Sequence, residues 1–141
     1  IHGMSRVSWM RYGHHLFEGI AVLWGLDIES VRSLNGEEGH DIVQLHYRSG
    51  LNVILEFITD VSLPIQFTCF SEGKGAFQVP FSDFFHSFRE MMARFAALAG
   101  GGKKPISHRE IVDIAQVILA GDLSKRGNGT AFSPHTLEPV T

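Results

Sequence analysis

Residues 11–25 read RYGHHLFEGIAVLWG, and they combine a strong helical pattern with the densest polar chemistry of the chain. From Leu16 to Trp24, apolar residues recur every three or four positions, which is the period of an α-helix that packs one face on a core. Gly25 follows where a helix commonly ends in left-handed backbone. The stretch therefore predicts a helix that packs on a second layer.

Two adjacent histidines, His14 and His15, stand at the start of this pattern. Glu18 lies four residues after His14 and three after His15, so on a helix its carboxylate can reach either imidazole. A carboxylate bound to one ring nitrogen fixes the tautomer of the ring. The arrangement is typical of a general base, and the spacing also predicts that the two adjacent rings point about 100° apart.

Downstream of residue 41 the apolar pattern changes to a period of two, which is typical of strands with one buried face. Gly50 and the Gly73-Lys74-Gly75 segment mark turns between the runs. The pattern predicts four consecutive antiparallel strands of one sheet, at residues 41–47, 51–57, 65–70 and 76–81. Residues 28–34 predict a further short strand before a turn at 35–39, and residues 1–10 predict a strand or an arm.

The second face of this sheet is mostly polar, and two apolar residues, Ile54 and Phe70, interrupt it. Such a face is either solvated or an interface between copies of the chain, and the sequence leaves both alternatives open. Its polar members are Gln44, His46, Asn52, Glu56, Gln66 and Thr68.

Two helices follow the strands. Residues 81–98 carry a wide aromatic and methionine stripe, which predicts a helix that begins at a Ser82 cap and covers the apolar face of the sheet. Ser107 and Glu110 form a capping box for a second helix that ends at Gly127. Residues 131–132 predict a short strand in an otherwise loose tail. The order of elements predicts an α+β two-layer sandwich, mostly antiparallel, with helices on one face and an open face available for oligomerisation.

Composition narrows the class of protein. The 141 residues, 44% of them hydrophobic, suit one domain spanning residues 1–141. A net charge of −3 without a basic stripe argues against nucleic acid, and no apolar run approaches the length of a membrane span. The single cysteine, Cys69, lies in a strand pattern as an inert core residue and fits a cytoplasmic protein. Because the sequence begins at Ile1, we expect either a fragment of a longer protein or a short added segment ahead of Met4.

Several kinds of site are not indicated. The eight histidines show no metal-binding spacing, and we expect no metal site. The Gly100–Lys104 run follows a helix and meets Pro105, whereas a phosphate loop follows a strand and opens a helix. No nucleophile elbow and no dinucleotide fingerprint occur, so we expect this chain to bind no cofactor by itself.

The start of the first helix, Gly13-x-His15-x-x-Glu18, and its end, Leu23-Trp24-Gly25, nevertheless resemble a known family. Together with the segment from Pro105-Ile106-Ser107 through Asn128-Gly129, they look like the C-terminal domain of the Gfo/Idh/MocA family, named after glucose-fructose oxidoreductase, inositol dehydrogenase and rhizopine catabolism. The resemblance covers residues 9–133.

The resemblance implies an NAD(P)-dependent oxidoreductase that acts on a sugar, cyclitol or related polyol. In that family an N-terminal Rossmann domain, absent from this chain, holds NAD or NADP, while this domain binds substrate and forms a dimer or tetramer through its open sheet. His15 would then transfer the hydroxyl proton, and Arg11, Tyr12, His14 and Glu18 would bind substrate. This chain alone would not be catalytically competent.

One position departs from the family pattern. Family members commonly carry an aspartate four residues before the histidine, where this sequence has Arg11. A guanidinium is not a base near neutral pH, although it can bind a carboxylate or phosphate through two hydrogen bonds. The alternative is therefore a stand-alone, non-catalytic module for dimerisation or ligand binding.

Overall fold

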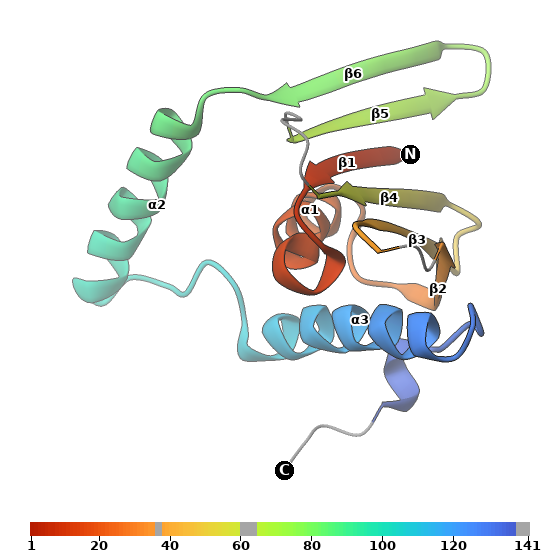
Figure 1. The fold of residues 1–141 in the computed structure, drawn as a ribbon. Helices are drawn as coiled ribbons and strands as arrows, with labels where there is room; N and C mark the ends of the chain where they lie inside the picture. The colour runs from red at the N-terminus through yellow and green to blue at the C-terminus, as the bar shows by residue number, and fades with distance from the viewer. Residues whose placement is uncertain (36–37, 60–64, 138–141) are drawn as a thin grey trace.

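The computed structural model describes residues 1–35, 38–59 and 65–137. The turn expected at residues 35–39 lies partly outside these ranges. Figure 1 shows the order of elements along the chain. These are β1 (His2–Arg6), α1 (Trp9–Trp24), β2 (Ile28–Asn35), β3 (His40–Tyr47), β4 (Asn52–Ile58), β5 (Ile65–Ser71), β6 (Gly75–Phe81), α2 (Phe84–Ala99), α3 (His108–Arg126) and the short 3-10 helix η1 (Pro134–Thr136).

Within the described residues, six strands form one sheet in the order β2-β3-β4-β1-β5-β6. The pairings β2-β3, β3-β4 and β5-β6 are antiparallel, as the alternating pattern predicts. However, β4 and β5 are not neighbours, so the expectation of four consecutive antiparallel strands is wrong at that point. The first strand, β1, lies between them, parallel to β4 and antiparallel to β5. Its Gly3 leaves room for the side chains of Leu55 and Phe67 on either side.

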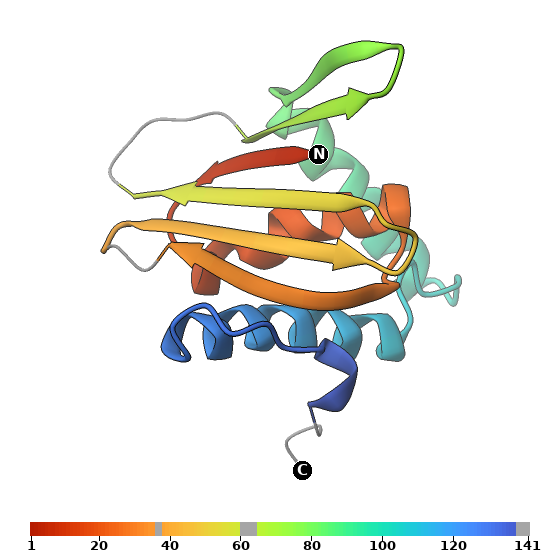
Figure 2. The same ribbon diagram turned by 90° about the vertical axis from the view of Figure 1, so that its right-hand side faces the viewer.

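In Figure 2, α1 lies behind the sheet and covers one of its faces, whereas α3 lies along the β2 edge. On β3 and β4 the inward residues are fully buried and alternate with the more exposed polar residues of the other face, as predicted. The helix α1 packs over β1 and β4, whereas α3 packs along β2 and against α1. An α+β fold with a mostly antiparallel, open sheet is therefore confirmed. The buried inward residues are Val43, Leu45, Tyr47, Val53, Leu55 and Phe57.

The helix α2 does not cover the sheet, which corrects the expectation for residues 81–98. It stands apart from the sheet and from α1 (Figure 1), and none of its residues is buried. Its cap is Asp83, whose carboxylate accepts from the backbone N–H of His86 at 2.7 Å, rather than Ser82. An apolar stripe on a helix indicates that it has a partner surface, but it does not identify that surface.

Other helix ends follow their sequence signals. Gly25 ends α1 with φ of 78°, and the capping box of Ser107 and Glu110 opens α3. The hydrogen bonds from the Ser107 backbone and hydroxyl lower the pKa of Glu110. The tail is more ordered than expected up to residue 137, because Phe132 pairs with Val31 and Pro134 is buried.

The start of α1 is held by a residue from another element. Ser8 occupies the cap position but makes no side-chain cap bond. Instead, the buried carboxylate of Asp41, on β3, accepts from the Trp9 backbone N–H at 2.9 Å. Its second oxygen accepts from the ammonium group of Lys125, near the end of α3. One carboxylate thus connects α1, the sheet and α3.

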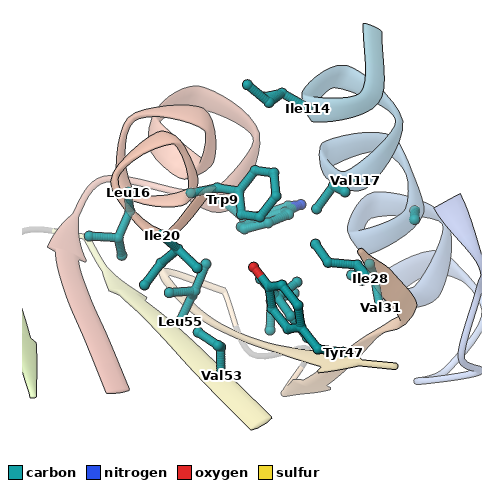
Figure 3. Packing of buried hydrophobic residues seen from close by; sticks show 14 of the residues in the cluster. Trp9, Leu16, Ile20, Ile28, Val31, Tyr47, Val53, Leu55, Ile114 and Val117 are labelled. Atoms are coloured by element: carbon teal, nitrogen blue, oxygen red, sulfur yellow. The ribbon is translucent and has the colours of Figure 1, made fainter. Parts of the chain in front are cut away.

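Trp9 fills the junction between α1 and α3 (Figure 3). Its indole N–H donates to the carbonyl of Ile118 at 2.9 Å, and its ring packs edge-on against Phe57. Two glycines make room for it. A Cβ at Gly13 would lie 2.7 Å from the ring, and one at Gly121 would lie 2.5 Å from the indole nitrogen. The two helices therefore approach closely only because both positions lack a side chain.

This packing predicts that Gly121→Ala destabilises the fold. The added methyl group would overlap the buried indole, and overpacking of this kind costs about 1–3 kcal/mol. Urea denaturation should show a loss of that size in the free energy of unfolding. The matched control is Gly100→Ala, because a Cβ there meets its nearest atom at an ordinary 3.5 Å. Equal losses in the two variants would contradict the close-packing argument.

Tyr47 is buried in the same core, and its hydroxyl donates to the carbonyl of Gly25 at 3.2 Å. Burial raises its pKa from 10.0 to about 12, because the phenolate would lose its hydration. The folded state therefore holds a proton that the unfolded chain releases above pH 10. The stabilisation from this proton is complete below pH 10 and is lost as the pH rises through about 12.

We therefore predict that the wild-type protein loses more stability between pH 10 and 12 than Tyr47→Phe does. The difference should be about 2 kcal/mol, since one pKa unit corresponds to about 1.4 kcal/mol. Denaturation at a series of alkaline pH values measures it. Parallel losses in the two proteins would show that this tyrosine does not carry the effect.

Candidate functional site

The candidate site lies on the first half of α1, directly after the Asp41-capped start of the helix. Arg11 and His15 are exposed and one helical turn apart, whereas Tyr12 and His14 are half-buried. This placement follows from the apolar spacing, because Leu16, Phe17 and Ile20 turn inward and leave the polar positions outside. The helix thus presents its polar residues away from the sheet.

The aromatic rings of this segment form one cluster. The imidazoles of His14 and His15 pack against each other with centroids 3.9 Å apart and an angle of 42°. The ring of Tyr12 meets His15 edge-on at 5.2 Å. The expectation that the two imidazoles point about 100° apart is therefore wrong, because side-chain torsions bring the rings together although their Cα–Cβ bonds diverge. His15 is held between two ring neighbours.

Glu18 does not orient either histidine. Among the described residues, no hydrogen bond joins its carboxylate to His14 or His15, which corrects the expected carboxylate–imidazole pair. Its exposed side chain instead lines a cleft of about 490 Å³ between α1 and the start of α3, with Arg94 of α2 on the third side. The cleft also touches Ala21, Val22, Gly25, Leu26, Pro105, Ile106, Glu110 and Ile114.

Arg11 belongs neither to the ring cluster nor to the cleft that Glu18 lines. Its side chain is exposed, and within the part of the chain that the structure describes it makes no ion pair or hydrogen bond. It lies one turn before His15, and a planar guanidinium on that side suits a carboxylate or phosphate ligand better than proton transfer. The structure thus brings Tyr12, His14 and His15 together, and it leaves Arg11 and Glu18 at the periphery.

The residues present do not fit a dinucleotide. Such a site needs a glycine-rich turn between a strand and a helix of a parallel sheet. Here the only such connection near the site is Val7-Ser8, between β1 and α1, and it contains no glycine. An exposed imidazole such as His15 can exchange a proton with a bound hydroxyl group, but this segment offers no place for a nicotinamide nucleotide.

A second polar cluster, which the sequence did not reveal, lies on the open face of the sheet. The carboxylate of Glu56 on β4 divides its two oxygens between two imidazoles. His2 Nε2, on β1, lies 3.0 Å from Oε2, and His40 Nε2, on β3, lies 2.7 Å from Oε1. All three side chains are less than one third exposed. The carboxylate thus connects three adjacent strands.

The signal for this cluster is present in the register but not in the local sequence. Glu56 pairs with Met4 on one side and with Ile42 on the other, which places His2 and His40 diagonally across from it. The alternation predicts the face of Glu56 correctly. It does not predict that β1 lies beside β4. The contact between His2 and Glu56 therefore could not be predicted from the sequence.

The next two statements hold for residues 1–35, 38–59 and 65–137. There, no group of three histidine, cysteine or acidic side chains is arranged to hold a metal ion, and no helix is long and apolar enough to cross a membrane. Cys69 is buried and free, in agreement with the expected core residue.

Comparison with known proteins gives a match at the level of structure. No protein-family model matches the sequence, and no curated protein matches it. Among solved structures, a protein assigned as a myo-inositol dehydrogenase from Sinorhizobium meliloti 1021 superposes with a TM-score of 0.64 at 16% identity, over 94% of this chain. The chain has the fold of a dehydrogenase domain.

Two other solved structures also match the fold of this chain. A protein assigned as a dehydrogenase from Thermotoga maritima matches with a TM-score of 0.63 at 11% identity over 96% of this chain. An NAD-binding protein from Listeria innocua matches with a TM-score of 0.57 at 15% identity over 94%. The chain spans only about half of each structure, between 54% and 56% of its length. The resemblance read from the sequence is thus confirmed as a shared fold.

The open-face cluster generates a prediction. Glu56→Ala leaves two partly buried imidazoles without their shared acceptor, which should cost about 1–2 kcal/mol of unfolding free energy. The matched control is Glu29→Ala on the same sheet, where the carboxylate is 53% exposed and lies 3.6 Å from His46. Exposed pairs contribute about 0–1 kcal/mol, so this loss should be smaller. Urea denaturation of both variants measures the two losses of unfolding free energy. A larger loss for Glu29→Ala than for Glu56→Ala would refute the prediction.

Proposed function

We propose that this chain is the substrate-binding and oligomerisation domain of an NAD(P)-dependent oxidoreductase that acts on a sugar, cyclitol or related polyol. The observation that carries the proposal is the fold shared with the dehydrogenases over nearly the whole chain. The exposed His15 at the start of α1 supports it, because the Gly13-x-His15-x-x-Glu18 segment resembles the catalytic helix of the Gfo/Idh/MocA family.

In this proposal His15 transfers the proton of the substrate hydroxyl. Its ring is exposed and held between Tyr12 and His14, so its direction is restricted without a carboxylate partner. The hydride acceptor, NAD or NADP, is bound by another part of the protein, since these residues do not fit a dinucleotide. Arg11 would contact a substrate carboxylate or phosphate, and Glu18 would bind hydroxyl groups in the cleft beside α1.

The open face of the sheet is proposed as the interface between copies. Its exposed and half-exposed polar residues alternate with a few apolar ones, such as Ile54 and Phe70, which is typical of an interface with a mixed character. In an isologous dimer the Glu56 cluster would face its own symmetry mate. We also expect the protein to work in the cytoplasm.

A second candidate is a non-catalytic module that binds a ligand or a second copy. Arg11 in place of the family aspartate favours it, as does the absence of a dinucleotide-binding turn among the described residues. Light scattering and a polyol-binding measurement on the chain distinguish the oxidoreductase domain from the non-catalytic module. A monomer that binds no polyol would argue against the module.

The test is a measurement of nicotinamide reduction in the whole protein with a panel of sugars and polyols that includes myo-inositol. We predict that His15→Asn lowers kcat by about 10²-fold or more, because general acid–base groups contribute 10²–10⁴ in rate. Circular dichroism should show an unchanged fold, since His15 lies outside the core.

The control for this experiment is His108→Asn, which makes the same change at an exposed histidine at the start of α3. It should leave kcat unchanged. Failure of the wild-type protein to oxidise any member of the panel, or full activity of His15→Asn, would refute the proposed role.

A further inference from the structure

The segment that follows α3 contains a chemically labile pair of residues, Asn128 and Gly129. The side-chain carbonyl of an asparagine can be attacked by the backbone nitrogen of the next residue, and glycine hinders this attack least because it has no side chain. The other asparagines are Asn35, whose following glycine lies outside the described residues, and Asn52, which a β-branched valine follows. Of the three, Asn128 combines an exposed side chain with a following glycine that the structure describes.

The side chain of Asn128 is open to reaction. It lies on the surface, and its backbone is left-handed, with φ of 52°, a conformation that asparagine tolerates better than most residues. Among residues 1–35, 38–59 and 65–137, no hydrogen bond holds its side-chain amide. The backbone position itself is set by Gly127, whose N–H donates to the carbonyl of Leu123 and ends α3.

The attacking nitrogen, by contrast, is held. The Gly129 N–H donates to the carbonyl of Ser124 at 2.8 Å, and the Gly129 carbonyl accepts from Nε of Arg32, on β2, at 2.8 Å. A backbone nitrogen can attack only after its N–H has left its hydrogen bond and lost the proton, as in amide hydrogen exchange. The fold therefore blocks the reaction at the nitrogen of Gly129 and not at the asparagine.

These bonds are part of a contact between the end of α3 and the edge strand β2. After α3 the chain turns back beside β2 (Figure 2), where Phe132 and Val31 exchange two backbone hydrogen bonds. A Cβ at Gly129 would lie 2.9 Å from the carbonyl oxygen of Ser33, so the two backbones approach closely. We call these interactions of Gly129 and Phe132 the α3–β2 contact.

We propose that Asn128 is a deamidation site, that opening of the α3–β2 contact sets its rate, and that the product weakens this contact. In the open state the Gly129 nitrogen attacks the side-chain carbonyl carbon of Asn128. A C–N bond forms and closes a succinimide ring, while the side-chain nitrogen leaves as ammonia with the proton of the Gly129 amide. Water then opens the ring to aspartate or isoaspartate. No electrons are transferred, and the proposal is independent of the proposed function.

Both products disfavour the closed contact. A carboxylate at position 128 lies at the negative end of the α3 dipole, which favours cations such as Lys125 and Arg126. Isoaspartate also inserts a methylene into the backbone directly before Gly129, where the Ser33 carbonyl leaves no space for an added carbon. A chain that has reacted once is therefore held less firmly at the end of α3.

Peptide mapping measures the rate at this one residue. Trypsin cleaves after Arg126 and releases residues 127–141, which contain one asparagine and no glutamine, so the mass gain of an amide-to-acid change reports Asn128 alone. The chain is incubated at mildly alkaline pH, folded or in guanidinium chloride. We expect the folded chain to react at least about tenfold more slowly, because its Gly129 N–H is protected. Equal rates in the two states would overturn the proposal, as would the absence of reaction in guanidinium chloride.

Paired substitutions test the control by the α3–β2 contact. Arg32→Ala removes the hydrogen bond to the Gly129 carbonyl and should raise the rate at Asn128 about threefold or more, the factor by which the loss of one hydrogen bond shifts an opening equilibrium. The matched control is Arg48→Ala, which removes an exposed arginine from its ion pair with Asp27. Because an exposed pair contributes little, it should leave the rate within about twofold. Equal acceleration by both variants, or by neither, would rule out this control.

Hydrogen exchange after a long incubation tests the effect of the product. The amides of Gly129 and Phe132 should exchange faster in wild-type chains that have deamidated. The control is Asn128→Gly, which lacks the reactive amide and accepts the same positive φ, and its exchange should not change during the incubation. Faster exchange in both proteins, or in neither, would refute the link between deamidation and the α3–β2 contact.

Discussion

The carboxylate of Asp41 is the interaction on which the arrangement of this domain depends. It is 6% exposed, and its two oxygens are shared between the first N–H of α1 and the ammonium group of Lys125 on α3. Hydrogen bonds that involve a charged group are about twice as strong as neutral ones, and a buried carboxylate without them would be costly. Because Asp41 belongs to β3, a single residue of the sheet contacts both helices.

The position of α1 then determines what its polar face presents. With its first turn fixed at Asp41, Trp9 enters the junction with α3, and the glycine at position 13 allows the helices to meet. The next polar residues fall on the outside of the helix, where Tyr12 and His14 pack around His15. The ring cluster is therefore a consequence of how the first turn of α1 is fixed and packed. Gly13, the glycine of the family-like motif, has a packing role rather than a chemical one.

Much of this fold follows from local signals in the sequence. The alternation in β3 and β4, the capping box of α3 and the positive φ of Gly25 were all predictable, because each depends on neighbouring residues. The place of β1 was not, since a short strand carries no local signal for its partner. The apolar stripe of α2 identified a contact surface but not its occupant. At the site, helical spacing predicts on which side of the helix His15 and Glu18 lie. It does not predict that the imidazoles meet or that Glu18 faces the cleft, because these contacts depend on side-chain torsions.

The central position of β1 has a consequence for the order of folding. Within the described sheet, the β5-β6 hairpin is attached to β2, β3 and β4 only through this strand of five residues. His2 must first meet Ile54, which closes a long loop, before β5 has an edge on which to pair. Contacts between residues so distant in sequence form slowly. We therefore expect the hairpin to join the sheet late, after β1 has paired with β4.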